Sequence, residues 1–450
     1  MKSTKDYSVI WQIAWPIILS SLANTVINFT DVAFVARVGE KELAASALGG
    51  VFYFVLVMIG IGFGIGLQIL IARRTGENRN DLVGEIFDNG ILLMLSFTVL
   101  MEFLVYLLMP SFIHLVISDP GVADACVQYL FARTWGLFFM MVLIALRSFY
   151  TGLASTRIIT YTTLVMMVLN ILFNYCLTLG NCGFTALGIF GSGLSSALAE
   201  AAAAIYAIIY TFRHTEFRSF DLFRFKKLSI PLAKQIFSLS APIVFQHLIS
   251  MMAWFTFFVL IERLGSHELA VSNIVRSIYM VLMTPIWGFS QAANSMVSNL
   301  IGQNKVEEVI SLIKRVSFMS LITGIFTTAL FLLFPQFIFH LTTSDNALIS
   351  HATNSFYVIC LATVIFSVSM ILLSSISGTG STRAAMFIEI SNISIYLIYI
   401  FSCSFVFNAS VELIWCSEIV YWLLMGIFSA GYLNSGKWKL NIENISADHV

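Results

Sequence analysis

The sequence predicts an all-α integral membrane protein with twelve transmembrane helices in two parallel-repeat six-helix bundles. Three observations support this prediction. Of the 450 residues, 58% are hydrophobic and only 11% are charged, whereas about 25% of the residues of an ordinary soluble protein are charged. Apolar runs long enough to cross the hydrocarbon core of a bilayer recur along the whole chain. The two halves of the chain also share motifs at one spacing. A soluble globular protein is therefore excluded.

Each apolar run of about 20 residues or more is expected to form one membrane-spanning helix. The first run follows Lys2 and Lys5, but it is too long for a signal-peptide core and is expected to be retained. The longest polar connection is a linker at 214–234, which separates an N-terminal lobe, 1–213, from a C-terminal lobe, 235–450. The twelve runs lie at residues 9–36, 45–72, 86–110, 123–146, 158–180, 187–212, 235–262, 270–298, 316–339, 352–376, 384–407 and 411–433.

One spacing, that between Pro16 and Pro242, aligns the two halves without a gap. We call it the repeat offset. It places "RVGEKELAA" at 37–45 on "RLGSHELAV" at 263–271, and "GLASTR" at 152–157 on "GTGSTR" at 378–383. Several matches at one shared offset indicate an internal duplication. Because each copy holds an even number of helices, both copies begin on the same side of the membrane. Parallel repeats of this kind are typical of transporters.

The distribution of basic residues predicts the orientation of the chain. The N-terminus and the connections after the even-numbered runs, including the linker, hold all but five of the 24 Lys and Arg residues. Both termini and the linker are therefore predicted to lie in the cytoplasm, with the chain in the cytoplasmic (inner) membrane. The five exceptions are Arg37, Lys41, Arg133, Arg263 and Arg276.

The first run, which contains "WPIILSSLANTVINFTDVAF" at 15–34, carries a polar stripe. Ser20, Asn24, Asn28 and Asp31 fall on one face of a helix. A carboxylate is costly to place in hydrocarbon, so this face is expected to point into the bundle. Snorkelling of Asp31 to the outer interface is the alternative.

Two prolines are candidate hinges. Pro16 removes a backbone hydrogen bond and is expected to bend the first helix, and Pro242 is expected to do the same in the second copy. The repeat mate of Asp31 is Phe257. The second copy keeps the proline and lacks the acid, so an ion-binding site is expected in the N-terminal lobe only.

Partners for the aspartate are expected on the fifth run, where Thr163, Asn170 and Asn174 share one face. Their oxygens could coordinate a small cation or hold a carboxyl group by hydrogen bonds. Polar packing between helices is the alternative. Ser192 in the sixth run could add an oxygen, and no other metal site is expected. The candidate cavity residues are Ser20, Asn24, Asn28, Thr163, Gln246 and His247, with Arg133, Glu200, Arg276 and Glu389 as weaker candidates.

In combination these residues resemble the multidrug and toxic compound extrusion (MATE) transporters, and most closely their DinF-like branch. The resemblance rests on proline followed fifteen residues later by aspartate, on "RVGEKELAA", "GLASTR", "LNILFN" and "FTALGIFGSG", and on the second copy. It implies that Asp31 binds the coupling proton or sodium ion, that protonation rearranges the first helix at Pro16, and that Asn170 is the asparagine of the fifth-helix motif. Relatives usually have "LNxxLD", and Asn174 replaces that second acid. This replacement favours protons over sodium.

The expected function is secondary active export of lipophilic or cationic organic compounds by antiport with protons, or with sodium. Alternating access would accompany bending of the first helix. The expected partners are a small organic cation or amphipathic substrate and the lipid bilayer, with no cofactor and no nucleic acid, and the chain is expected to be a monomer.

Three other functions compete with this expectation. A flippase for a lipid or lipid-linked precursor, from the same superfamily, is the nearest alternative. Its cavity would need several cationic residues, and only Arg133 and Arg276 are candidates. An enzyme is disfavoured because the chain has no H-E-x-x-H or G-x-S-x-G motif. A channel is disfavoured because a duplication with a bend in each copy implies alternating access.

Overall fold

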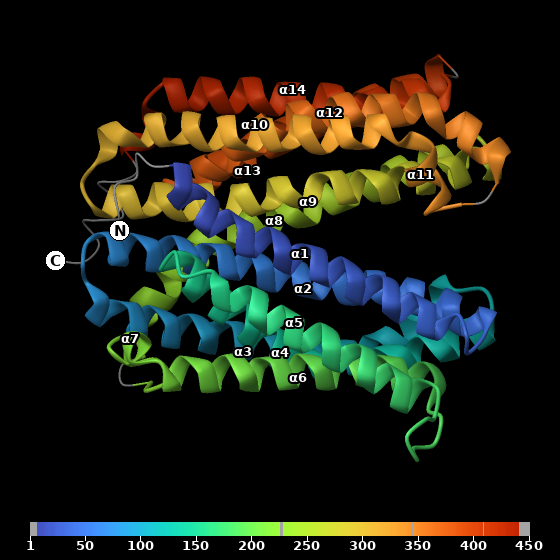
Figure 1. Cartoon of the computed structure of the whole chain (residues 1–450), viewed down its shortest axis with the longest axis horizontal. Coiled ribbons are helices and arrows are strands. Elements are labelled where there is room, and N and C mark those ends of the chain that lie inside the picture. The colour runs from blue at the N-terminus through green and yellow to red at the C-terminus, as the bar shows by residue number, and fades with distance from the viewer. Residues whose placement is uncertain (1–6, 226–227, 344, 408, 441–450) are drawn as a thin grey trace. The chain divides into compact units, whose positions relative to one another are not determined.

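The computed structural model describes residues 7–225, 228–343, 345–407 and 409–440, which form helices joined by turns (Figure 1). Within this part of the chain, twelve helices are long and apolar enough to cross a membrane, which is the number predicted. The protein is therefore a multi-pass membrane protein. Of the basic residues used for the orientation, Lys2, Lys5, Lys226 and Lys227 lie outside the described residues.

The helices of the first half are α1 (Tyr7–Val35), α2 (Glu40–Gly76), α3 (Asn80–Val116), α4 (Pro120–Gly152), α5 (Arg157–Phe173), the π-helical turn η1 (Asn174–Thr178), α6 (Gly188–Arg213) and the short α7 (Thr215–Arg218). Those of the second half are α8 (Ile230–Glu262), α9 (Ser266–Gly302), the 3₁₀ turn η2 (Val306–Glu308), α10 (Val309–Leu333), the short α11 (Pro335–His340), α12 (Asn346–Gly378), α13 (Thr382–Phe401), the π-helical turn η3 (Ser402–Val406) and α14 (Val411–Asn434).

The helix bounds confirm the duplication. α2 runs from residue 40 to 76 and α9 from 266 to 302, so both ends are shifted by the repeat offset, and α4 and α12 are related in the same way. The packing repeats as well. α4 contacts α2, α3 and α6, and α12 contacts the corresponding helices α9, α10 and α14, while α5 packs on α6 as α13 packs on α14.

Equivalent aspartates begin α4 and α12. One Oδ of Asp119 accepts hydrogen bonds from the backbone N–H groups of Val122 at 3.1 Å and Gly121 at 2.7 Å. Asp345 caps α12 in the same way, from Ala347 N–H at 2.8 Å. The N–H groups of Val122 and Gly121 hold the pKa of Asp119, which precedes the membrane-spanning part of α4, below its ordinary value.

The chain separates into two compact units, which we call the N-terminal unit, Leu19–Val244, and the C-terminal unit, Met1–Ile18 with Phe245–Val450. These units differ from the expected lobes 1–213 and 235–450. The reason is that α1 and α8 each contribute to both units, and each boundary falls two residues after a proline, Pro16 or Pro242.

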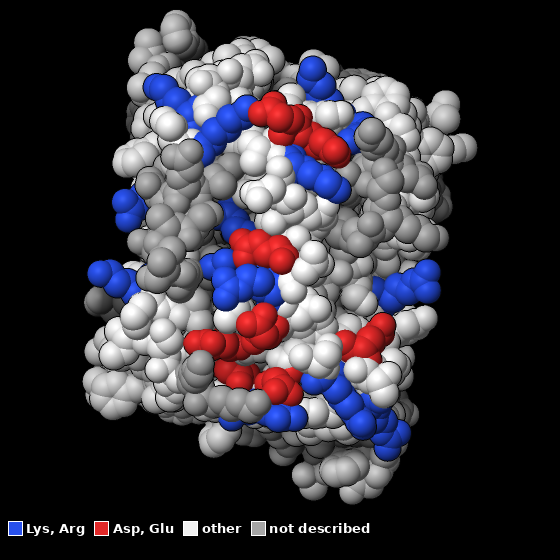
Figure 2. Space-filling model, turned by 90° about the vertical axis from the view of Figure 1, so that its left-hand side faces the viewer, with Lys and Arg blue, Asp and Glu red and all other residues white. Residues whose placement is uncertain are grey.

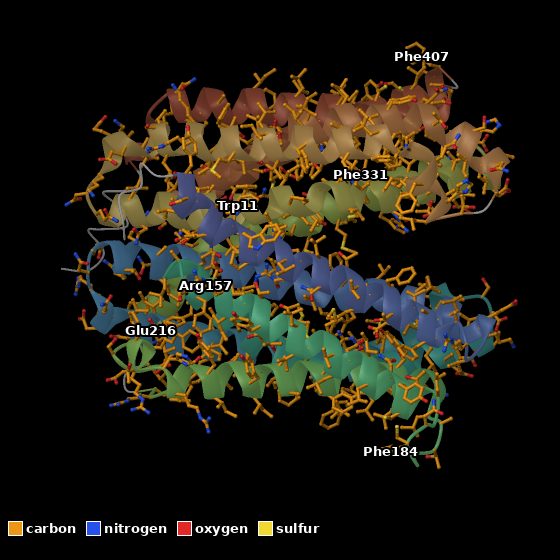
Figure 3. The ribbon with its side chains drawn as sticks, viewed as in Figure 1. Trp11, Arg157, Phe184, Glu216, Phe331 and Phe407 are labelled. Carbon is orange, nitrogen blue, oxygen red and sulfur yellow. The ribbon has the colours of Figure 1, made fainter. Side chains whose placement is uncertain are left out.

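The start of α1 packs within the C-terminal unit. Trp11 stacks on Trp15 with ring centroids 5.4 Å apart and meets Phe289 of α9 at 5.9 Å (Figure 3). The start of α8 packs within the N-terminal unit, where the Ser240 hydroxyl donates to the carbonyl of Phe63 at 3.4 Å.

The linker is held against α3 where it is described. The Asp88 carboxylate accepts the backbone N–H groups of Phe223 at 2.7 Å and Phe225 at 2.6 Å, and the Asn89 carbonyl accepts that of Ser229 at 2.9 Å. Figure 2 shows the end of the molecule where α2 is followed by α3, and Lys and Arg side chains lie on it together with Asp and Glu. The cytoplasmic location of this end remains a prediction.

Candidate functional site

Asp31, near the end of α1, is hydrogen-bonded to α6 and to the helix formed by α5 and η1. The Asn174 side-chain amide donates to its Oδ1 at 2.8 Å, and the Ser196 hydroxyl donates to its Oδ2 at 3.2 Å. The side chain of Asn170 also hydrogen-bonds the carboxyl group. With Thr178 these residues form what we call the Asp31 cluster, which lies entirely in the N-terminal unit.

The hydrogen bonds inside the Asp31 cluster fix the direction of each amide. The Thr178 hydroxyl donates to the side-chain oxygen of Asn174 at 2.9 Å, so the nitrogen of that amide faces the carboxylate. Asn170 donates to the Ser196 hydroxyl at 3.2 Å, and that hydroxyl donates onward to the carboxylate. The donors therefore converge on one carboxylate. The chain turns π-helical at Asn174, and π-helical turns are frequent at functional sites.

The serine of α6 in this cluster is not the predicted one. Ser192 is buried, and the hydroxyl that reaches Asp31 belongs to Ser196, one turn further along α6. The predicted serine therefore lies on the correct helix, α6, but one turn away from the serine that contacts Asp31. Ser196 could have been a candidate from the sequence, because residues four apart share a helical face. The sequence does not give the position of α6 along the axis of α1, so it could not decide between the two serines.

The predicted polar stripe of α1 divides into separate parts. The Ser20 and Thr163 hydroxyls are hydrogen-bonded at 2.7 Å, two turns or more from Asp31. Asn24 and Thr163 line a cavity of about 90 Å³. Asn28 is exposed. Ser20, Asn24 and Thr163 thus lie together at the cavity, whereas Asp31 lies with the two asparagines of the fifth helix.

Two other predicted cavity residues, Arg133 and Glu200, form a buried ion pair. Arg133 Nη2 lies 2.6 Å from Glu200 Oε1, and its guanidinium stacks over the ring of Tyr53 at 3.7 Å. The Tyr53 hydroxyl donates to the same carboxylate at 3.2 Å. The charge of Arg133 is therefore balanced within the protein.

The C-terminal unit replaces the Asp31 cluster by aromatic rings. Phe257, at the position equivalent to Asp31, is buried with 2% exposure and packs edge-on against Trp415 at 4.9 Å. The repeat offset places Tyr396 at the position of Asn170 and Trp422 at that of Ser196. This aromatic cluster surrounds a buried carboxylate, Glu418, which accepts the hydroxyls of Tyr279 at 3.1 Å and Tyr396 at 3.5 Å. The repeat offset places Glu418 at the position of Ser192, not at that of Asp31.

Gln246 and Glu389 lie at the positions equivalent to Ser20 and Thr163. Each is related to its counterpart by the repeat offset, and both are buried. Glu389 also accepts the Ser250 hydroxyl at 2.5 Å and that of Tyr421. His247, beside Gln246 on α8, is half-buried. The predicted cavity residues of the seventh run are therefore placed differently: the Gln246 side chain is buried and that of His247 is half-buried.

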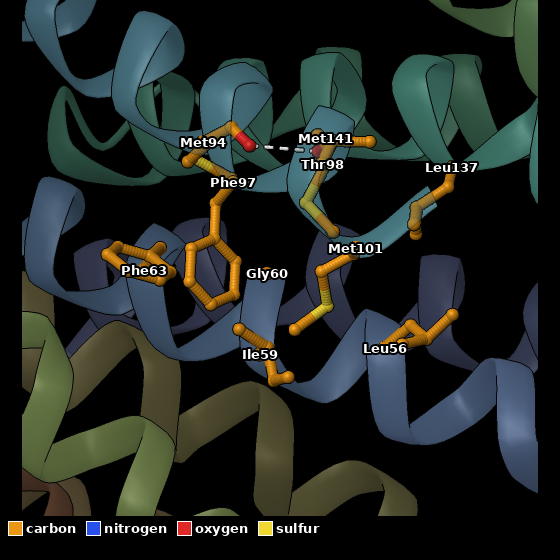
Figure 4. A pocket seen from close by; sticks show the side chains of 10 residues that line it. All are labelled: Leu56, Ile59, Gly60, Phe63, Met94, Phe97, Thr98, Met101, Leu137 and Met141. Atoms are coloured by element: carbon orange, nitrogen blue, oxygen red, sulfur yellow. Dashed lines mark hydrogen bonds between the residues drawn. The ribbon is translucent and has the colours of Figure 1, made fainter. Parts of the chain in front are cut away.

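A second cavity, of about 10 Å³, lies between α2, α3 and α4 (Figure 4). Its lining is apolar apart from Thr98, whose hydroxyl donates to the carbonyl of Met94 at 2.8 Å. A space of this size holds at most one water molecule. It is a packing void. Among the described residues, no group of three or more His, Cys, Asp or Glu side chains is placed to hold a metal ion.

The two copies are matched separately by one protein-family model. The model MatE matches residues 16–176 and again 242–407. Both matches begin at a proline, Pro16 or Pro242, so their starts differ by the same repeat offset as the helices. The chain belongs to the MatE family. MatE proteins are transporters, so this protein is a transporter and not an enzyme, as predicted. Its assignment to the DinF-like branch remains a prediction.

Curated relatives of this MatE protein cover most of its length. One from Photorhabdus laumondii, called "Probable multidrug resistance protein NorM", is 25% identical over 387 residues, which are 83% of this chain and 82% of the relative. A protein of the same name from Neisseria meningitidis serogroup B is 25% identical over 438 residues, covering 92% of this chain and 94% of the relative.

Solved structures confirm the MATE fold. An outward-facing multidrug resistance MATE family transporter of the MOP superfamily matches with a TM-score of 0.88 and 17% identity, covering 99% of this chain and 97% of that chain. A mutant of VcmN, a MATE transporter from Vibrio cholerae, matches with a TM-score of 0.87 and 15% identity, covering 96% of this chain and 98% of that chain. At these identities the likeness concerns the fold.

Proposed function

We propose that this MATE protein is a multidrug efflux transporter that exports lipophilic or cationic organic compounds by antiport with protons, with sodium as the alternative coupling ion. The observation that carries the proposal is the Asp31 cluster. A single carboxylate on α1 accepts hydrogen bonds from the fifth and sixth helices, and Pro16 lies fifteen residues earlier on the same helix.

Protonation would weaken the attachment of α1 to its neighbours. An ionised carboxylate only accepts hydrogen bonds, whereas a protonated carboxyl group presents one O–H donor. The amide of Asn174 and the hydroxyl of Ser196 both donate to Asp31. A proton on either carboxyl oxygen faces one of these donors, so the hydrogen bond there must rearrange. The part of α1 after Pro16 would then be released, and the proline already lacks the backbone bond that would resist bending.

The direction of the Asn174 amide supports protons over sodium. A sodium ion bound to the Asp31 carboxylate would need further oxygen ligands around it. The side-chain oxygen of Asn174 cannot serve in this arrangement, because it accepts the Thr178 hydroxyl. The cluster also has one formal negative charge, that of Asp31. Export would require the proton and the substrate to differ in affinity for the two arrangements of α1. We place the protein in the cytoplasmic membrane as a monomer with both termini inside.

The test is efflux of a fluorescent lipophilic cation from proteoliposomes under a proton gradient and, separately, under a sodium gradient. We expect proton-driven efflux by the wild type and none by Asp31→Asn, which keeps the shape of the side chain. Glu216→Gln, at an exposed glutamate of α7 (Figure 3), is the control and should behave as wild type. Efflux driven by the sodium gradient would show that the coupling ion is sodium and not the proton. Coupled efflux by Asp31→Asn would show that the aspartate does not bind the coupling ion.

A further inference from the structure

The cavity of about 90 Å³ in the N-terminal unit has a polar wall built by three helices. Asn24 comes from α1, Arg147 and Tyr150 from α4, and Thr162 and Thr163 from α5. Met140, Leu143 and Met166 add an apolar side. The cavity is partly open, so it can admit one end of a larger molecule.

Arg147 has no counterion among the described residues. No carboxylate in that part of the chain lies within salt-bridge distance of its guanidinium, so its charge is not balanced there. Arg133, on the same helix, is paired with Glu200 at 2.6 Å. An unpaired charge inside a membrane protein is costly and is retained where it meets water or a ligand. Arg147 therefore differs from Arg133 in having its charge available to the cavity.

The size and chemistry of the cavity limit what it can bind. A volume of about 90 Å³ is several times the roughly 10–15 Å³ that one water molecule needs and lies below the roughly 300–1,000 Å³ of pockets for drug-sized ligands. This is enough for a carboxylate or phosphate group and too little for a whole drug-sized molecule. A guanidinium recognises such groups through charge-assisted hydrogen bonds, and the amide of Asn24 and the hydroxyl of Thr162 can supply further donors. The methionine and leucine side chains suit the apolar part of the same molecule.

We propose that this cavity binds the anionic head group, a carboxylate or a phosphate, of an amphipathic substrate, with Arg147 as its charged contact. The inference rests on the proposed export function and deepens it, because it requires at least some transported compounds to carry an acidic group. Asn24 and Thr162 are assigned as hydrogen-bonding contacts beside the guanidinium, because the Thr163 hydroxyl already donates to the carbonyl of Ile159 at 2.9 Å.

The same helix serves both sites. Asn24 lies on α1 seven residues before Asp31, about 10 Å along the helix axis. A ligand that contacts Asn24 and an ion that binds Asp31 therefore both act on the part of α1 that follows Pro16. This shared helix gives a physical route by which the two ligands can affect each other's affinity.

The experiment compares two dyes that differ in one group. Rhodamine B carries a free carboxylate, and its ethyl ester has the same cationic ring system with that carboxylate blocked. Binding of each dye to purified protein in neutral detergent is measured by fluorescence polarisation, which does not depend on transport. The proteins are the wild type, Arg147→Gln, Arg147→Lys and Arg157→Gln. Arg157 is exposed at the start of α5 (Figure 3) and serves as the control.

We expect the wild type to bind rhodamine B more tightly than the ester. Arg147→Gln should lose about tenfold or more in affinity for rhodamine B and little for the ester. Arg147→Lys should keep most of the preference, and Arg157→Gln should match the wild type. Equal binding of the two dyes by the wild type, or equal losses for both dyes in Arg147→Gln, would overturn the proposal.

A second arm identifies the source of the head group. Wild type and Arg147→Gln are placed in nanodiscs of phosphatidylcholine, with or without phosphatidic acid. If phosphatidic acid displaces rhodamine B from the wild type, the site accepts a lipid phosphate, and the flippase alternative gains support. If it does not, the head group belongs to a carboxylate-bearing organic compound. Dye discrimination without any efflux would leave this site standing and reject the export function, so the two failures are distinguishable.

Discussion

The side-chain amide of Asn174 donates a hydrogen bond of 2.8 Å to the carboxylate of Asp31. The two residues are 143 positions apart in the chain, on η1 and α1. Their contact joins the helix that carries Pro16 to the helix that carries the fifth-helix motif. It also places a neutral donor where the resemblance to MATE transporters led us to expect a second acid.

Asn174→Asp should create sodium dependence. Two carboxyl groups this close would not both ionise unless a cation lay between them, and the variant would supply a second negative charge as a ligand. We expect sodium-driven dye efflux to rise at least severalfold over the wild type at constant pH. Asn174→Leu, which supplies no ligand, is the control. An Asn174→Asp protein that ignores sodium would show that the cluster cannot be converted by charge alone.

Ser196→Ala and Ser192→Ala separate the observed site from the predicted one. Ser196 donates to Asp31 at 3.2 Å, so its loss removes a hydrogen bond to a charged group, which is worth about 1.5–3 kcal/mol. We expect the pH at which efflux is half-maximal to move upward in Ser196→Ala, because the ionised carboxylate loses a donor. Ser192→Ala should leave that pH unchanged. Equal shifts in both variants would contradict the geometry.

Glu200→Gln should destabilise the protein strongly. Removal of one partner leaves the buried Arg133 charge uncompensated, which typically costs about 3–5 kcal/mol. The matched control is Glu389→Gln, because Glu389 is also buried and its hydrogen-bond partners are neutral side chains. Thermal unfolding in detergent should show a clearly lower midpoint for Glu200→Gln than for Glu389→Gln. Similar midpoints would mean that the ion pair adds little to stability.

Asp119→Ala should lower stability in a manner that depends on pH. The carboxylate caps α4 and its pKa is lowered in the folded protein, so its contribution is present above the unfolded pKa of about 3.9 and is lost as the pH falls through the folded value. The difference in unfolding midpoint between wild type and variant should be present at neutral pH and shrink at acidic pH. Asp119→Asn, which keeps a capping oxygen without the charge, should lose less stability than Asp119→Ala. A difference that stays constant with pH would reject this account.

The helices and the duplication could be predicted from sequence because both are local properties. A bilayer requires long apolar segments, and the repeat offset read from Pro16 and Pro242 also relates the bounds of α2 to those of α9. The importance of Asp31 could be predicted for the same reason. A carboxylate on the polar face of an apolar helix is unusual whatever surrounds it.

Three features of the site could not be predicted from the sequence. They are the turn of α6 that contacts Asp31, the ion pair of Arg133 with Glu200, and the lack of a counterion for Arg147 among the described residues. Each depends on the height and rotation of helices that are far apart in the sequence, and helix packing fixes these through many side-chain contacts at once. The assignment of the start of α1 to the C-terminal unit depends on packing in the same way.

The sequence by itself determined the number of membrane helices, the internal repeat and the one acidic position on the first helix. Each of these depends only on the order of residues in the chain: on the length of apolar runs, on the spacing of motifs and on an isolated charge. The tertiary structure decided which side chains meet that acid and which of the α4 arginines, Arg133 or Arg147, has a carboxylate partner among the described residues. Those choices depend on how neighbouring helices pack, and packing is a property of the whole unit.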